Sequence, residues 1–401
     1  MPKYSLRGIN MPESPIRKLA PYAQSAKDKG IKVYHLNIGQ PDIKSPKTAV
    51  EAVKNMNLDI FEYAPSAGYL YYRKTLCQYY HSLGFTDLTP DNFLVTNGGS
   101  EALQFTLSCI CDEGDEILLP EPFYANYYGF AQSLGVKIQP LVSGIEDGFA
   151  LPDLSKYEEL ITPKTKAILI TNPGNPTGYL YSRKELEDLC KIVLKHDIFV
   201  IVDEVYREYV YDGEKHHSIL EFSELKDHAI VIDSESKRYS MTGIRCGFLV
   251  TRSSTFIDTA LKFAQARLSP VLLGQIAANA AHSEPQSYID GVRKEYTERR
   301  DLLIKLLNEI PDVVCPKPKG AFYCMAELPV ENAEDFCLWL LKDFDYQGTT
   351  VMLAPAEGFY SNHELGRRQV RIAYVLKKED LTKSVEILKK ALEEYKKVEL
   401  S

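Results

Sequence analysis

The sequence lacks the long apolar runs and the excess of positive charge that mark membrane and nucleic-acid-binding proteins. Apolar stretches such as residues 198–202 are far too short to span a bilayer. Residues 1–7 contain no apolar segment of the kind that directs secretion. The formal net charge of −8 argues against a nucleic-acid or anionic-membrane surface. We therefore expect a cytoplasmic protein that binds neither nucleic acid nor membranes.

Cysteine groupings that would indicate a metal site or a disulfide framework are also missing. The eight cysteines are scattered, and the one close pair, Cys109 and Cys111, has no second pair or histidines at zinc spacing nearby. We expect buried free thiols in a reducing compartment and no metal site.

The sequence does contain a regular alternation of short apolar runs with helical patterns. With 45% hydrophobic and 25% charged residues, a chain of 401 residues suffices for one large domain and a smaller one. Several runs are continuously apolar, as strands covered on both faces must be. The pattern predicts an α/β domain with a mostly parallel sheet. The runs are residues 92–96, 116–119, 136–139, 167–171, 198–202, 229–232 and 247–251.

The pattern changes near residue 285. We expect a charged, amphipathic helix over residues 288–310, an apolar stretch at 320–325, and helices at 333–344 and from residue 379 onward. No internal repeat or low-complexity linker separates this part from the rest. It predicts a second domain of α+β type.

Polar groups follow three of the predicted strands, at the point where each strand ends. Residues 172–178 (NPGNPTG) follow the run 167–171, Asp203 follows the run 198–202, and residues 234–237 follow the run 229–232. Open α/β sheets bind ligands beyond the carboxyl ends of their strands. These groups therefore predict a ligand site at one edge of the sheet.

Lys237 is the most informative of these residues. It ends the segment 233–237 (DSESK), and Arg245 follows eight residues later. A lysine that forms a Schiff base needs an amine that loses its proton easily and an anchored carbonyl partner. The hydroxyls of Ser234 and Ser236, together with Arg245, can hold a phosphate beside it. The alternative is a solvated surface lysine.

Together these segments resemble the motifs of the class I/II aminotransferases, a fold type I family that uses pyridoxal 5'-phosphate. The resemblance runs from residue 36 to residue 371 and implies that Lys237 bonds to the cofactor aldehyde. It implies that Asp203 meets the pyridine nitrogen, where a buried anion turns the ring into an electron sink. It also implies that Asn175 and Tyr206 share the phenolic oxygen. Without the resemblance, Asn175 is a turn former and Asp203 is the N-cap of a following helix.

Three further segments are similar to parts of the same cofactor site. Gly99 and Ser100 open a helix in residues 97–103 (NGGSEAL), where backbone N–H groups can approach a phosphate; a plain turn is the alternative. Tyr124 corresponds to the aromatic residue that stacks on the pyridine ring, with a core tyrosine as the alternative. Tyr63 corresponds to a tyrosine that reaches the phosphate of the neighbouring subunit, which implies a homodimer.

The resemblance also implies a substrate site made of Gly39, Asn175 and Arg371. Arg371 interrupts the apolar run 370–373 (VRIA), where a guanidinium is costly unless it meets a carboxylate. It corresponds to the arginine that binds the α-carboxylate, and the backbone N–H of Gly39 can reach the same group. Arg367 and Arg368 lie in a polar stretch and are expected on the solvated surface.

The domain layout follows from the same resemblance. A seven-stranded, mostly parallel sheet covered by helices forms the large domain, residues 46–285, while residues 1–45 and 286–401 form a smaller α+β domain. Two segments depart from the family pattern. Residues 354–360 read APAEGFY where relatives often have Pro-Gly before Phe-Gly, and Glu235 replaces the usual aromatic residue between the two serines.

The expected function is transfer of the amino group of an L-α-amino acid to a 2-oxo acid such as 2-oxoglutarate, with Lys237, Asp203 and Tyr206 as catalytic residues. Aspartate or aromatic donors are favoured, although the helix-opening lysine of some aspartate-specific relatives is Ser100 here. Two candidates for a distal-carboxylate partner, Arg17 and Arg267, cannot be placed from the sequence.

Two alternative functions stay open. One is a β-elimination lyase similar to cystathionine β-lyase, and the other is a ligand-sensing regulator, which would need an appended DNA-binding domain.

Overall fold

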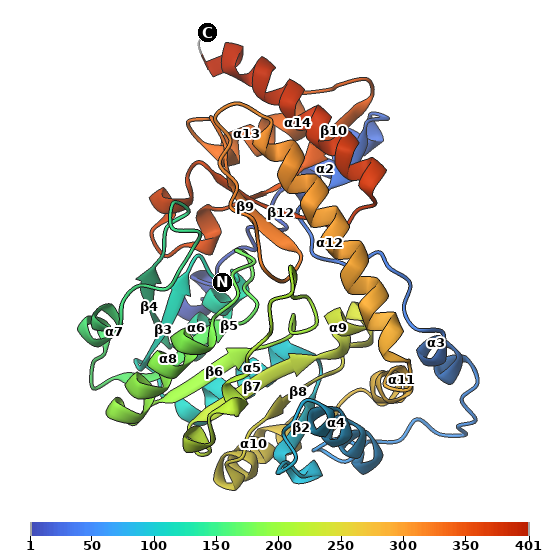
Figure 1. The fold of residues 1–401 in the computed structure, drawn as a ribbon, viewed down its shortest axis with the longest axis vertical. Helices are drawn as coiled ribbons and strands as arrows, with labels where there is room; N and C mark the ends of the chain where they lie inside the picture. The colour runs from blue at the N-terminus through green and yellow to red at the C-terminus, as the bar shows by residue number, and fades with distance from the viewer. Residues whose placement is uncertain (1, 400–401) are drawn as a thin grey trace.

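The computed structural model describes residues 2–399. A seven-stranded sheet forms the lower part of the molecule in Figure 1, and two smaller sheets lie above it. The strand order is β2-β8-β7-β6-β5-β3-β4; β8 is antiparallel to both its neighbours, and all other pairs are parallel. The predicted mostly parallel sheet is therefore confirmed. Its strands are β2 (Phe93–Thr96), β3 (Glu116–Glu121), β4 (Lys137–Val142), β5 (Thr165–Thr171), β6 (Phe199–Asp203), β7 (Ala229–Ser234) and β8 (Gly247–Val250).

Helices cover both faces of this sheet, which explains why its central strands are continuously apolar. In β6, Val200 and Val202 pack with α4 and α8, whereas Ile201 between them packs with α5, α6 and α10 on the other face. The helices of this part are α3 (Lys47–Lys54), α4 (Leu70–Ser82), α5 (Gly99–Ile110), α6 (Asn126–Leu134), α7 (Leu154–Leu160), α8 (Arg183–His196), α9 (Glu235–Arg238), α10 (Ser254–Ala266) and α11 (Leu272–Ala281).

Strands β6 and β7 extend past the predicted runs into polar residues of the candidate site. Asp203 still pairs with Ile232 on β7, and Ser234 still pairs with Gly247 on β8. Both polar side chains therefore lie on the rigid tips of strands, which fixes their positions more tightly than a loop would.

The N-terminal and C-terminal parts of the chain meet above the large sheet (Figure 1). Strand β1 (Lys32–His35) pairs in parallel with β10 (Thr349–Met352), and β12 (Gln369–Ala373) lies between β9 (Tyr323–Glu327) and β11 (Ala354–Pro355) in an antiparallel sheet. The three helices predicted after residue 285 are present, with ends within two residues of those expected. The helices of this part are α1 (Leu6–Ile9), α2 (Ala20–Asp28), α12 (Gln286–Asn308), α13 (Ala333–Lys342) and α14 (Lys378–Glu399).

All eight cysteines are free thiols. Six are buried as expected, but Cys109 and Cys111, at the end of α5, are only partly buried. Within residues 2–399, no helix combines the length and the apolar character needed to cross a membrane.

Candidate active site

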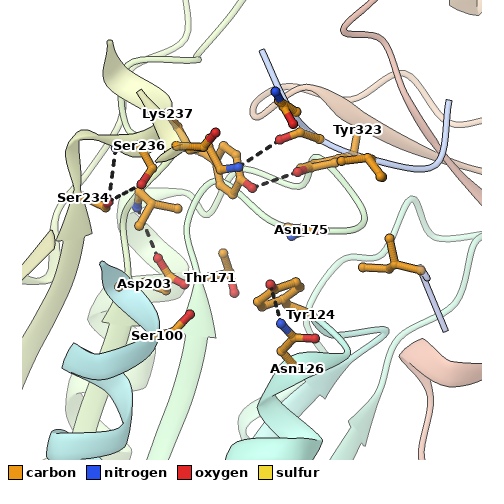
Figure 2. A pocket seen from close by; sticks show the side chains of 18 of the residues that line it. Ser100, Tyr124, Asn126, Thr171, Asn175, Asp203, Ser234, Ser236, Lys237 and Tyr323 are labelled. Atoms are coloured by element: carbon orange, nitrogen blue, oxygen red, sulfur yellow. Dashed lines mark hydrogen bonds between the residues drawn. The ribbon is translucent and has the colours of Figure 1, made fainter. Parts of the chain in front are cut away.

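A cavity of about 620 Å³ lies at the carboxyl ends of the central strands (Figure 2). Thr171 of β5, Asp203 of β6 and Ser234 of β7 line one side of it. Gly39 and Arg371, from the terminal parts of the chain, line the cavity as well. The sheet and the terminal segments thus enclose one cavity, and the polar residues at the strand ends meet there.

Lys237 projects into this cavity from α9, the short helix that follows β7. Its Nζ donates a hydrogen bond to the carbonyl of Gly39 over 2.9 Å. Burial lowers the pKa of Lys237 to about 8, helped by the positive charges of Arg371 and Arg245 and opposed by Asp203. The solvated-surface alternative is therefore wrong, and the amine can lose its proton near neutral pH.

Asp203 is held at the tip of β6 by two donors. Its Oδ2 accepts a hydrogen bond from the Tyr127 hydroxyl over 2.7 Å, and its Oδ1 accepts one from the backbone N–H of Val205 over 3.3 Å. Burial raises the pKa of Asp203 to about 6, although both hydrogen bonds oppose the rise. Residues 205–208 form a turn, so the helix-cap alternative is wrong. A partly buried carboxylate of this kind is stabilised by a cationic ligand group.

One wall of the cavity offers groups that can hold an anion. Gly99 and Ser100 line it at the start of α5, where backbone N–H groups and the positive end of the helix dipole face the cavity. Gly98 has a φ of 90°, and a Cβ there would lie 2.4 Å from Nη2 of Arg245. The glycine therefore allows the guanidinium to approach the helix start closely.

The two serines of the lysine segment have different environments. Ser234 Oγ lies 2.8 Å from the carbonyl oxygen of Cys246 and 2.9 Å from Ser236 Oγ. Ser234 therefore holds Ser236 in place, and both residues line the cavity.

Arg371 forms the opposite end of the site. Its side chain is 1% exposed and lies between the rings of Tyr323 and Phe359, with Cζ 4.5 Å and 5.1 Å from the ring centroids. It donates to Asn175 Oδ1 over 3.1 Å and to the Asn37 carbonyl over 2.5 Å. Within residues 2–399, its Nε has no hydrogen-bond partner. The guanidinium meets no carboxylate of the described chain, so it can accept one from a ligand.

The aromatic residues occupy distinct places. Tyr206 lies with its hydroxyl 3.0 Å from that of Tyr323, and burial raises the pKa of Tyr206 well above its usual value. Tyr124 lines the cavity, and its hydroxyl accepts a hydrogen bond from Asn126 Nδ2 over 2.7 Å (Figure 2). Tyr63 is 76% exposed and is not part of the cavity lining.

The other arginines singled out from the sequence differ in whether they line the cavity. Arg17 lines the cavity, whereas Arg267 lies outside the lining and pairs with Glu101 over 2.6 Å. Arg367 and Arg368 are exposed, as expected.

The family model described as "Aminotransferase class I and II" matches residues 31–388. The chain belongs to this family. An aspartate aminotransferase of Bacillus subtilis is 30% identical over 383 residues, which cover 93% of this chain and 94% of the relative. A (5-formylfuran-3-yl)methyl phosphate transaminase of Methanocaldococcus jannaschii is 32% identical, with 97% and 99% covered. An alanine aminotransferase structure from Pyrococcus furiosus has a TM-score of 0.89 at 33% identity, and the match covers 98% of this chain and 100% of that one.

This chain is therefore a transaminase of a family that uses pyridoxal phosphate. Two site residues of this aminotransferase were not identified from its sequence. Tyr127 lies three residues after Tyr124 but has no local signal, because its partner Asp203 is 76 residues away. Tyr323 contacts Tyr206 and Arg371, which are likewise distant in sequence.

Proposed function

We propose that this aminotransferase binds pyridoxal 5'-phosphate in the cavity and transfers the amino group of an L-α-amino acid to a 2-oxo acid such as 2-oxoglutarate. Aspartate and aromatic amino acids are the favoured donors. The observation that carries the proposal is the placement of Lys237, Asp203 and Arg371 around one cavity at the carboxyl ends of the strands. An amine of lowered pKa, a partly buried carboxylate and a guanidinium without an acidic partner are the groups this reaction requires.

The residues present fit the cofactor. Asp203 is a partly buried acid whose anion a protonated ring nitrogen would stabilise, and Lys237 would supply the amine for the covalent bond. When bound, the cofactor ring accepts the electron pair released at the Cα atom of the amino acid. Gly99, Ser100, Ser234, Ser236 and Arg245 would hold its phosphate, Tyr124 would cover the ring, and Asn175 and Tyr206 would hold its phenolic oxygen.

Lys237 is the residue of the chain that transfers the proton in the proposed reaction. With its pKa near 8, Nζ takes the α-proton of the amino acid and returns a proton later in the cycle, as general base and then general acid. Arg371 grips the α-carboxylate, with Gly39 and Asn175 beside it, and so orients the Cα–H bond toward Lys237.

We also propose that the working unit is a homodimer in the cytoplasm, with Tyr63 reaching the phosphate of the neighbouring subunit. Leu58, Ile60, Phe61 and Tyr63 are all exposed in the single chain, which supports burial of this segment against a second copy. Each subunit would consist of a large domain, residues 46–285, and a small domain made of residues 1–45 and 286–401.

A panel of amino donors tests the reaction. The protein is reconstituted with pyridoxal phosphate and mixed with each donor and 2-oxoglutarate, and the products are identified chromatographically. We expect the 2-oxo acid of the donor and glutamate in equal amounts. Ammonia, with or without a thiol, in place of glutamate would instead indicate β-elimination. Cofactor binding without any product would indicate a sensor.

A further inference from the structure

The cavity has one more cation than the proposed reaction uses. Among the described residues that line it, four are basic and Asp203 is the one acidic side chain. The proposed function assigns Lys237 to the cofactor aldehyde, Arg245 to the phosphate and Arg371 to the α-carboxylate. The fourth cation, Arg17, is left without an assignment.

The guanidinium of Arg17 has no polar partner among the described residues. Within residues 2–399, its guanidinium has no hydrogen bond or ion pair, and the side chain is exposed. Its neighbour Lys18, by contrast, pairs with Glu334 on α13. The positive charge of Arg17 opposes the rise in the pKa of Tyr124, so the guanidinium acts on the cavity wall that carries this ring.

The segment that carries Arg17 is fixed relative to Arg371. Asn37 Nδ2 donates to the carbonyl of Ile16 over 3.0 Å, and the Asn37 carbonyl accepts from Arg371 Nη2 over 2.5 Å. One buried asparagine thus links the backbone next to Arg17 to the guanidinium at the other end of the site. The backbone beside Arg17 is therefore held at a defined position relative to Arg371.

Apart from the four cations and Asp203, the described lining residues carry no charged side chain. Ser14, Ile16, Ile38 and Asn126 are neutral, and the helix start carries Ser100 where a lysine stands in some relatives. A negative group on the substrate side chain can therefore pair with Arg17 without competing for the cofactor residues.

We propose that Arg17 binds the distal carboxylate of the substrate and so makes dicarboxylic amino acids and 2-oxo acids the preferred substrates. This inference rests on the proposed function, because it assigns the α-carboxylate to Arg371.

The test compares wild type, Arg17→Gln and Arg17→Lys in separate half-reactions with the pyridoxal phosphate holoenzyme. Aspartate and glutamate are compared with alanine and phenylalanine as donors, and 2-oxoglutarate with pyruvate as acceptors. We expect the ratio of kcat/KM for dicarboxylic over neutral substrates to fall about tenfold in Arg17→Gln, as for loss of a charge-assisted hydrogen bond. Arg17→Lys should retain part of the ratio. The control Arg368→Gln removes an exposed arginine outside the cavity and should keep the wild-type ratio.

The other outcomes separate the two proposals. An equal loss of kcat/KM with all substrates in Arg17→Gln would mean that Arg17 only supports the fold of its segment. Unchanged kcat/KM values would mean that Arg17 does not contact the substrate. Either result would contradict the inference. Arg371→Lys provides the contrast, since it should weaken every substrate alike. A wild-type protein that transaminates none of the donors would contradict the proposed function itself.

Discussion

At the scale of single residues, the environment of Asp203 favours a cationic ligand group beside its carboxylate. A carboxylate with a pKa of about 6 is held at the end of an apolar strand by Tyr127 and Val205. Without a ligand, its ionisation costs stability near neutral pH, because the folded state binds a proton more tightly than the unfolded chain does. The protein tolerates this cost at a position where a cationic ring nitrogen would offset it.

Asp203→Asn should slow transamination by about a hundredfold or more, because the ring nitrogen loses its anionic partner. The cofactor-free protein offers a second measurement. As the pH rises from 3.8 to about 6, wild type should lose stability through this group, up to the order of 3 kcal/mol, and Asp203→Asn should lack this loss. Urea unfolding of both proteins at pH 4 and pH 7 checks the difference. A loss of activity smaller than tenfold would show that the carboxylate does not serve the reaction.

At the scale of elements, the four-residue helix α9 is too short to hold Lys237 in place by itself. A buried ionic network supports it. Arg238 Nη2 lies 2.5 Å from Asp233, and Arg238 Nη1 lies 2.9 Å from Glu235. Glu235 also accepts from Tyr72 of α4 and from His282, which follows α11, each over 2.8 Å. Glu235, which replaces an aromatic residue of the family pattern, therefore connects the lysine helix to two neighbouring elements.

Glu235→Gln should lower the free energy of unfolding by about 3 kcal/mol at pH 7, because it leaves the buried Arg238 guanidinium with less compensating negative charge. Although burial opposes ionisation, His282 and Arg238 lower the pKa of Glu235 to about 2. Its contribution should therefore be full above pH 4.5 and decline as the pH falls toward 2. Urea unfolding of wild type and Glu235→Gln at pH 7 and pH 3 measures this contribution.

Glu393→Gln, at an exposed pair with Lys390, is the control. It should lower the free energy of unfolding by less than about 1 kcal/mol. An equal loss of stability in both variants would contradict the account.

The strands and the polar residues at their ends could be predicted from the sequence because burial on both faces leaves a visible pattern. A strand buried on both faces must be continuously apolar, so a polar residue such as Asp203 or Ser234 at its end is visible in the sequence. The contacts made across the fold leave no such signal. Tyr206 meets Tyr323 across 117 residues, and Glu235 meets Tyr72 across 163, so neither pair was predicted.

At the scale of the whole molecule, the site exists because both ends of the chain return to the large sheet. The parallel pairing of β1 with β10 brings residues 32–35 beside residues 349–352, and the strand β12 carries Arg371 over the cavity. Asn37 then links the N-terminal segment to Arg371. Two of the proposed substrate-binding residues, Gly39 and Arg371, thus come from the terminal segments, whereas the proposed cofactor-binding residues Asp203 and Ser234 lie at the ends of sheet strands.

The central claim is that Lys237 forms the covalent bond with the cofactor. The most direct test is borohydride reduction of the protein reconstituted with pyridoxal phosphate, followed by peptide mass mapping. We predict a stable cofactor adduct on the peptide that contains Lys237 in wild type and in Arg17→Gln, and none at this site in Lys237→Ala, whose fold should persist. An adduct located on a different lysine, or no adduct in wild type, would contradict the account.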